Sequence, residues 1–270
     1  MPGRTIITGA SGSIGAAVTR ALAERGEAVV MACRNPEMAR SVRERILAEF
    51  PAADLEIRPL DLSSLDSVRS FAASFDGERI SSLFNNAGAI NREYVLTGDG
   101  LEKTFAVNYF SPVLLTLLLL SRMDPDARIV NMVSLTCRFV SLTGSALRPA
   151  PEEFSQLGTY ARSKLALLHF SLELARRRPD LRINVADPGI VNSNMISMGR
   201  WFDPLADLLF RPFCKSPEMG AVPALAALSS AGRNRYFVGK RCLEMPRRYV
   251  DPVKDRQLFE ETLRILQQPF

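Results

Sequence analysis

Histidine and cysteine are scarce in this chain, and their scarcity excludes several kinds of site. There is one histidine, His169, among 270 residues, so a Ser-His-Asp triad or a multi-histidine metal site would have to centre on it. It falls in the apolar helical run 165–174, where we expect a packed or helix-surface side chain rather than a catalytic one. The cysteines are far apart and form no Cys-x-x-Cys pair: Cys33, Cys137, Cys214 and Cys242. We therefore expect no metal site, and reduced thiols in a cytoplasmic protein.

Long hydrophobic runs and a charge of one sign are also missing. The longest apolar stretch, 113–120, is too short to span a bilayer, and no segment of secretory-signal pattern precedes the first predicted strand. We expect no transmembrane segment. The formal charge is +5, and the basic residues are spread out except at 176–178 and 247–248. The first cluster ends a predicted helix, where cations suit the helix dipole, so we expect no nucleic-acid binding.

What the sequence does have is a regular alternation of short β-branched runs and helical patterns. The predicted strands are 4–8, 28–32, 55–60, 80–85, 128–133, 182–186 and 236–239. The predicted helices are 13–25, 36–50, 64–75, 101–121, 159–177 and 217–230. This alternation predicts a doubly wound parallel sheet with helices on both faces, a three-layer α/β/α Rossmann fold in a single domain, 1–270.

A glycine-rich turn lies between the first predicted strand and the first predicted helix. It reads Thr8-Gly9-Ala10-Ser11-Gly12-Ser13-Ile14-Gly15. Glycines let the backbone turn sharply and approach a pyrophosphate, whose charge is favoured by the N-terminus of the helix. Glycines can also simply end a strand, but after the first strand of an alternating chain they favour dinucleotide binding.

The end of the second predicted strand indicates which dinucleotide. An acid there would bind a ribose 2′-hydroxyl and repel a 2′-phosphate. The strand ends instead in Cys33-Arg34-Asn35, and Arg34 offers a planar, charged fork that suits phosphate. We therefore expect NADP(H) to be preferred over NAD(H), although Arg34 could also be a solvated loop residue.

Tyr160 and Lys164 are the candidates for proton chemistry. Four residues apart on a predicted helix, they project from one face. A free phenol titrates near pH ~10, and a neighbouring ammonium favours the phenolate and lowers that value. A Tyr-x-x-x-Lys pair alone is common on helix surfaces, so the argument depends on the other motifs.

Together these motifs resemble the short-chain dehydrogenase/reductase family. Further matching segments are Asn85-Asn86-Ala87-Gly88 after the fourth strand, Ala106-Val107-Asn108-Tyr109, Ser134 at the end of the fifth strand, and Asp187-Pro188-Gly189-Ile190-Val191-Asn192-Ser193 after the sixth. The pair Asp61-Leu62 resembles the family's residues beside the adenine, although Asp61 could instead cap the next helix. One departure is Ser13, which replaces the middle glycine of the family's turn. The resulting TGxxGxxG spacing is similar to that of the extended, epimerase-type relatives.

The resemblance implies a hydride-transferring site with four catalytic residues. Tyr160 would exchange a proton with the substrate oxygen, Ser134 would bind that oxygen, Lys164 would lower the tyrosine pKa and hold the nicotinamide ribose, and Asn108 would support a water chain. The implied cofactor contacts are Thr8, Gly9, Ser11, Gly12, Ser13, Ile14, Gly15, Arg34, Asp61, Leu62, Asn86, Ala87, Gly88, Tyr160, Lys164, Pro188, Gly189, Val191 and Ser193.

Two segments bear on the substrate. The inserted loop at about 138–158 and the later run 213–221 resemble retinol-dehydrogenase-like members of the family, and the loop also resembles protochlorophyllide-reductase-like ones. The segment at about 193–215 corresponds to the family's substrate lid, and its aromatic and leucine residues favour a bulky, apolar carbonyl or alcohol. The same residues could instead form a helix packed on the core, or one making peripheral membrane contact.

Other functions and states stay open on the sequence alone. The turn spacing allows a nicotinamide-dependent epimerase or dehydratase, and a non-catalytic NADP-sensing interaction protein is a third possibility. The family often dimerises through the helices corresponding to 108–120 and to the Tyr160 helix. A homo-oligomer is therefore plausible, although the inserted loop could obstruct that surface.

Overall fold

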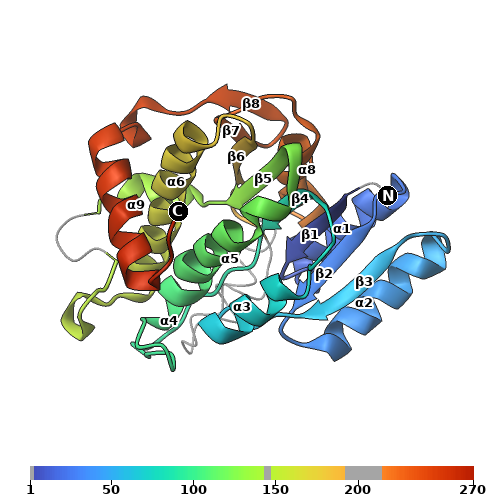
Figure 1. Cartoon of the computed structure of the whole chain (residues 1–270), viewed down its shortest axis with the longest axis horizontal. Coiled ribbons are helices and arrows are strands. Elements are labelled where there is room, and N and C mark those ends of the chain that lie inside the picture. The colour runs from blue at the N-terminus through green and yellow to red at the C-terminus, as the bar shows by residue number, and fades with distance from the viewer. Residues whose placement is uncertain (1–2, 143–146, 192–214) are drawn as a thin grey trace.

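The computed structural model describes residues 3–142, 147–191 and 215–270 (Figure 1). Its centre is an eight-stranded sheet in the order β3-β2-β1-β4-β5-β6-β7-β8. The strands are β1 (Arg4–Thr8), β2 (Val29–Cys33), β3 (Leu55–Pro59), β4 (Ile80–Asn85), β5 (Met123–Met132), β6 (Arg182–Asp187), β7 (Arg235–Val238) and β8 (Arg241–Glu244). All neighbours pair in parallel except β8, which runs antiparallel to β7.

Helices cover both faces of this sheet, as Figure 1 shows. One face carries α1 (Ser13–Glu24), α2 (Pro36–Glu49) and α8 (Pro217–Ser229), whose buried residues form one apolar cluster with β1 and β2. The other carries α3 (Leu65–Ala73), α5 (Ser111–Leu119) and α6 (Gln156–Arg177). β2 is buried along its whole length because it is covered on both sides. The doubly wound α/β prediction is confirmed.

The predicted helix over 101–121 is interrupted in the structure. It consists of α4 (Lys103–Phe105), a π-helical turn (Ala106–Phe110) and α5, followed by a 3₁₀ turn (Leu120–Arg122). π-Turns inside helices are often found at functional sites, and this one carries Asn108.

The same helical stretch has the length and composition of a membrane span. Lys103–Arg122 covers 20 residues. An 18-residue window within it has a mean hydropathy of 1.6, and 78% of that window is buried inside the protein. A helix packed on one face of a sheet and covered by its neighbours is apolar all round for the same reason. Its burial therefore identifies it as a core helix.

Two C-terminal elements were missing from the sequence prediction, the edge strand β8 and the helix α9 (Pro252–Leu266). β8 has no apolar alternation, because most of its residues are exposed. The helix did carry a start signal: Asp251 is its N-cap, with the side chain accepting from Lys254 N, and Pro252 is its first residue.

α9 packs on α6 as an additional layer outside the three expected ones (Figure 1). Its Asp255 is fully buried and accepts from His169 Nδ1 on α6 at 2.5 Å and from Arg176. Phe259 stacks on Phe170 of α6 with ring centroids 5.4 Å apart. Of the two placements expected for His169, packed or on the helix surface, the structure has the packed one.

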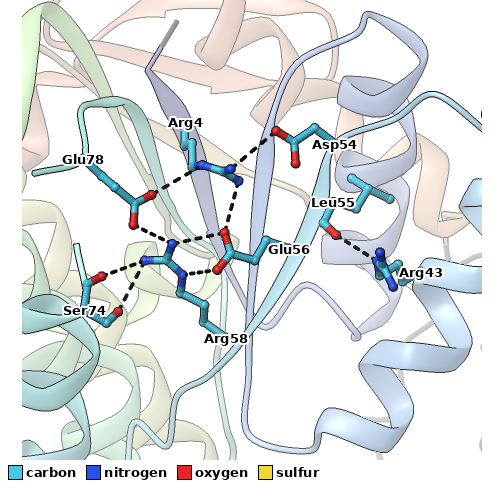
Figure 2. Close-up of polar contacts among 8 residues, drawn as sticks. All are labelled: Arg4, Arg43, Asp54, Leu55, Glu56, Arg58, Ser74 and Glu78. Atoms are coloured by element: carbon cyan, nitrogen blue, oxygen red, sulfur yellow. Dashed lines mark hydrogen bonds and ion pairs between the residues drawn. The ribbon is translucent and has the colours of Figure 1, made fainter. Parts of the chain in front are cut away.

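A network of charged residues, most of them at or just before the amino-terminal ends of β1, β3 and β4, ties these strands together (Figure 2). Arg4, at the start of β1, pairs with Asp54, Glu56 and Glu78 at 3.5, 3.2 and 3.4 Å. Arg58 on β3 also binds Glu56 and Glu78, each at 2.6 Å. Because ligands of parallel α/β sheets bind at the carboxyl ends of the strands, we interpret this network as structural.

Candidate active site

The glycine-rich turn at the carboxyl end of β1 has the open backbone that a phosphate group needs. Gly9 has a φ of +66°, a left-handed conformation that favours glycine. A Cβ on Gly15 would lie 2.3 Å from the Gly9 carbonyl oxygen, so glycine is what lets α1 begin so close to the turn. Within the described chain, no side chain caps α1, and its first turn carries no acid. Its first N–H groups can therefore bind an anion, which the helix dipole favours.

Ser13, the departure from the family's glycine pattern, is the first residue of α1 and is exposed. The turn is closed by the Gly12 N–H, which donates to the Gly9 carbonyl at 2.9 Å. An exposed serine buries no unpaired polar group. The altered spacing is therefore compatible with an intact turn.

Thr8 and Asn86 join this turn to the end of β4. The Thr8 hydroxyl accepts from the backbone N–H groups of Asn86 and Ala87, both at 3.0 Å. The Asn86 side chain donates to the Thr8 carbonyl at 2.9 Å. The side chains of Thr8 and Asn86 are thus used to hold the turn together. The groups of the turn that remain to bind a ligand are those of its backbone.

Arg34 directly follows β2 and is exposed, with no hydrogen bond or ion pair among the described residues. Two residues before it, the Ala32 carbonyl accepts from the Gly9 N–H of the glycine-rich turn at 2.8 Å, and burial raises the pKa of the intervening Cys33 thiol. The end of β2 therefore lies against the turn. Arg34 is the cation that this arrangement places beside the predicted phosphate site.

Asp61 and Leu62 lie after β3, farther along the same edge of the sheet. Asp61 Oδ1 accepts from the Ser63 N–H and hydroxyl at 2.8 and 2.7 Å. The N-cap of α3 is Ser64, so Asp61 orders the preceding turn rather than capping the helix. Leu62 is 6% exposed and packs in the core.

The Tyr160 phenol and the Ser134 hydroxyl lie together at the carboxyl end of β5. Tyr160 is in the second turn of α6, with its phenol within electrostatic reach of Ser134. Burial raises the pKa of the phenol to about 12, against a lowering by the Ser134 hydroxyl. The Ser134 oxygen accepts from the Thr136 hydroxyl at 2.9 Å. The two hydroxyls could thus both reach one substrate oxygen.

Lys164 lies one helical turn after Tyr160 and is almost fully buried. Its Nζ donates to the Met132 carbonyl at 2.9 Å, and burial lowers its pKa to about 8. The sequence predicted that Lys164 would lower the pKa of Tyr160. In the structure the phenol shifts the other way, because burial dominates and the ammonium group is directed at a backbone oxygen.

Asn108 on the π-helical turn connects the NNAG segment to α6. Its Oδ1 accepts from Ala89 N at 2.7 Å, and its Nδ2 donates to the Ala89 carbonyl and to the Ser163 hydroxyl at 2.9 and 3.0 Å. Gly88 fits between these groups, since a Cβ there would lie 3.4 Å from both Asn108 Oδ1 and Lys164 Nζ. The structure thus brings three of the four predicted catalytic residues to neighbouring positions, with Ser134 joined to them through Tyr160.

The segment after β6 completes the edge of the site. Gly189 has a φ of +70°. The Pro188 carbonyl accepts from Lys215 Nζ at 3.2 Å, and Val191 pairs with Lys215 in an isolated bridge. Packing also joins this segment to the phosphate turn, because a Cβ on Gly220 would meet both Val191 and Ile14.

Some sequence predictions fall outside the described residues. They are Ser193, most of the lid segment at about 193–215, and positions 143–146 of the inserted loop.

The residues present fit a dinucleotide with a 2′-phosphate. The cradle at Gly9 and Gly15 leaves room that a Cβ would fill, the N-terminus of α1 is uncapped, and Arg34 is available. The turn would hold the pyrophosphate, and Arg34 the additional phosphate. Asn86 and Gly88 lie between the glycine-rich turn and Tyr160 along the carboxyl edge of the sheet. The 188–191 segment lies at the same edge.

Fold and site together define a dinucleotide-binding oxidoreductase built on a doubly wound sheet. The family model described as "short chain dehydrogenase" matches residues 4–200. The chain therefore belongs to the short-chain dehydrogenase family, and its curated relatives are of the retinol-dehydrogenase-like type.

Individual relatives agree with this assignment. The chain is 34% identical to the WW domain-containing oxidoreductase of Danio rerio over 97% of this chain and 68% of that protein. It is 31% identical to human retinol dehydrogenase 13 over 98% of this chain and 85% of that protein. Among solved structures, a short-chain dehydrogenase from Shigella flexneri in complex with NADP shares the fold, with a TM-score of 0.69 and 20% identity over 88% of this chain and 97% of that one.

Several residues at the site were not singled out from the sequence. Ser163 lies inside the Tyr-x-x-x-Lys motif and binds Asn108. Thr136 lies two residues after Ser134, and Lys215 binds the segment after β6. Asp187, at the end of β6, accepts from the Tyr236 hydroxyl at 2.7 Å. None of these contacts follows from spacing, because each depends on how separate elements meet.

Proposed function

We propose that this protein is an NADP(H)-dependent oxidoreductase that transfers hydride between the nicotinamide and a carbonyl or alcohol carbon, with Tyr160 as general acid and base. The observation that carries the proposal is the pairing of the Tyr160 phenol with Ser134, the residue that lowers the pKa of that phenol, at the same edge of the sheet as the glycine-rich turn. Proton donor and nucleotide cradle are thus built into one rigid scaffold.

In this mechanism Tyr160 and Ser134 bind the substrate oxygen and hold the carbon in position. When bound, the reduced nicotinamide supplies a hydride with its electron pair to the carbonyl carbon and is itself oxidised. Tyr160 gives its proton to the oxygen, which becomes the alcohol hydroxyl, and takes it back in the reverse direction. Lys164 and Asn108 hold the elements around Tyr160 in place: Lys164 donates to the Met132 carbonyl, and Asn108 donates to Ser163, whose hydroxyl donates to the Tyr160 backbone carbonyl.

The preference for NADP(H) rests on Arg34 and on the absence of an acid at the end of β2, whose residues are Val29–Cys33. A guanidinium binds a 2′-phosphate with two parallel hydrogen bonds, whereas an acid there would repel it.

Arg34→Glu is expected to weaken NADPH binding at least about tenfold and to leave NADH binding little changed or slightly stronger. Both affinities would be measured by titration of nicotinamide fluorescence. Arg45→Glu is the matched control, since Arg45 is an exposed arginine on α2 and the charge change is the same. Equal weakening by both variants would point to a general charge effect. If wild type bound neither nucleotide, the oxidoreductase proposal would fail.

For the substrate we propose a bulky, apolar carbonyl or alcohol. Three exposed hydrophobic side chains flank the site elements: Phe139 after Ser134, Leu157 before Tyr160 and Ile190 after Pro188, at 76%, 56% and 59% exposure. Apolar side chains at such positions would bury an apolar substrate.

A chain-length series tests this preference. Turnover of straight-chain aldehydes with NADPH should rise in kcat/KM by about three- to fourfold per added methylene while the chain is being buried. Small polar carbonyls such as glyceraldehyde serve as the comparison. A higher kcat/KM for the small polar compounds would rule out the apolar-substrate proposal.

A further inference from the structure

The π-helical turn Ala106–Phe110, which carries Asn108, is the irregular point of a long core helix. Its defining bond runs from the Ser111 N–H to the Ala106 carbonyl, five residues earlier instead of the four of an α-helix. Such turns are rare, so the contacts around this one matter for where its side chains lie. Side-chain hydrogen bonds attach it to other parts of the chain in three directions.

Two of these attachments lead toward the site. Asn108 binds the Ala89 backbone and the Ser163 hydroxyl. Ser111, directly after the turn, donates from its hydroxyl to the Leu62 carbonyl at 2.7 Å. Residues after β3, after β4 and on α6 therefore all meet at the turn.

The third attachment leads away from the site, to the C-terminal helix. Tyr109 is fully buried, and its hydroxyl lies 2.5 Å from Thr262 Oγ1 on α9. The Thr262 hydroxyl donates its own proton to the Leu258 carbonyl at 2.7 Å, so it accepts from Tyr109. Burial raises the pKa of the Tyr109 phenol and keeps its proton in place. The bond therefore has one direction, from the turn to α9.

Asn108 and Tyr109 are consecutive residues, so a constraint on one limits the rotation of the other. From Asn108 the connection continues into α6. Its Nδ2 donates to Ser163 Oγ at 3.0 Å, and Ser163 Oγ donates to the Tyr160 carbonyl at 2.7 Å. A series of hydrogen bonds and peptide units thus joins α9 to the backbone of the proposed proton donor.

We propose that Tyr109 and Thr262 are positioning residues: their buried hydrogen bond lets α9 hold the π-helical turn in the register that directs Asn108 at its partners. Asn108 held in this way keeps Tyr160 in place relative to the substrate oxygen. Tyr109 and Thr262 are both buried, and they act through Asn108 rather than on the substrate. This inference rests on the proposed function.

The competing explanation is that aromatic packing alone holds the turn. The Tyr109 ring makes edge contacts with Phe105 and Phe110, with ring centroids 6.4 and 5.2 Å apart. Tyr109→Phe separates the two explanations, because it keeps these ring contacts and removes only the hydroxyl. Thr262 would still donate to the Leu258 carbonyl, so we expect this variant to fold.

Tyr109→Phe is expected to lower kcat for reduction of a straight-chain aldehyde by about three- to tenfold, the factor that one buried hydrogen bond is worth. NADPH affinity, from titration of nicotinamide fluorescence, should stay within about twofold of wild type, because the change leaves the glycine-rich turn intact. A lower kcat with unchanged KM and nucleotide affinity is the pattern of a misplaced catalytic group.

Amide hydrogen exchange, followed by NMR without nucleotide or substrate, gives a readout that needs no turnover. The Ala89 N–H donates to Asn108 Oδ1 at 2.7 Å, so its protection reports where the Asn108 amide lies. In Tyr109→Phe, exchange at Ala89 should be at least about threefold faster relative to the amides of β1. Taking the ratio to β1, a strand inside the sheet, removes the effect of a change in global stability.

Three variants on α9 serve as controls. Thr262→Ser keeps the accepting hydroxyl and should match wild type in both readouts, whereas Thr262→Val removes it and should change both as Tyr109→Phe does. Phe259→Leu weakens the packing of α9 on α6 at Phe170 and spares the hydroxyl pair. It should lower the thermal unfolding temperature but leave kcat and Ala89 exchange within about twofold of wild type.

Wild-type kcat and wild-type Ala89 exchange in Tyr109→Phe would overturn the proposal. Equal changes in Phe259→Leu would also overturn it, because α9 would then act by packing alone. The two proposals fail separately. If wild type neither binds NADPH nor turns over a carbonyl, the oxidoreductase function falls, while exchange at Ala89 still decides whether α9 holds Asn108. With binding and turnover but no effect of the hydroxyl, only the positioning role falls.

Discussion

Tyr160→Phe is expected to lower kcat for carbonyl reduction by about three orders of magnitude, while NADPH affinity stays within about twofold of wild type. The change removes one oxygen atom, the proposed proton donor, and keeps the ring that packs at the start of α6. General acid catalysis by a positioned group is worth roughly 10²–10⁴ in rate, so loss of the donor should cost that much. The measurement is steady-state NADPH oxidation beside a fluorescence titration of the nucleotide.

Tyr94→Phe is the matched control for this experiment. Tyr94 packs edge-on against Phe154, with ring centroids 6.0 Å apart, and loses the same atom. It should retain turnover within a few-fold of wild type. If Tyr160→Phe kept full turnover, another group would be the proton donor. If wild type bound NADPH and turned over no carbonyl or alcohol, a nucleotide-sensing protein would be the better description.

Gly15→Ala is expected to weaken NADPH binding by about ten- to a hundredfold. The new Cβ would lie 2.3 Å from the Gly9 carbonyl oxygen and 2.9 Å from Ala10 Cα and Asn86 Nδ2. Two of these atoms belong to the backbone of the turn, so the turn itself must move, and overpacking of this kind costs about 1–3 kcal/mol. Displaced N–H groups would no longer meet the pyrophosphate together.

Two variants separate this effect from general damage. Gly98→Ala adds the same methyl group where nothing lies within 4 Å, and it should change neither binding nor thermal unfolding. Ser13→Gly restores the family's usual glycine at an exposed position and should alter NADPH affinity by less than about threefold. A large gain in Ser13→Gly would show that the unusual spacing impairs the site. Unchanged binding in Gly15→Ala would contradict the proposed cradle.

Most of the fold was predictable because the parallel sheet leaves a strong local signal. Strands covered on both faces are continuous apolar runs, and Ile80–Asn85 is found as predicted. β5 is the exception, since it begins at Met123 rather than at the predicted residue 128. Its early part contains exposed residues and a register shift against β4, and neither can be derived from apolar periodicity.

The residues of the site were predictable through the motif resemblance, and their contacts were not. Sequence spacing placed Tyr160 and Lys164 on one helical face, but the direction of the Lys164 ammonium toward Met132 depends on how α6 crosses β5. The Asn108–Ser163 and Asp187–Tyr236 contacts join residues 55 and 49 positions apart. Such pairs require the order of the strands, which local patterns do not contain.

The C-terminal helix has a consequence for how this molecule can meet others. On α9, Asp255 binds His169 and Phe259 stacks on Phe170, so α9 covers this side of α6, the helix that carries Tyr160. Thr262 on α9 is hydrogen-bonded to the hydroxyl of Tyr109, the neighbour of Asn108, at 2.5 Å. A second copy approaching this flank would touch α9 rather than the elements that bear the proposed chemistry. The chain's own C-terminal helix therefore covers a side of α6 that a second subunit could otherwise cover.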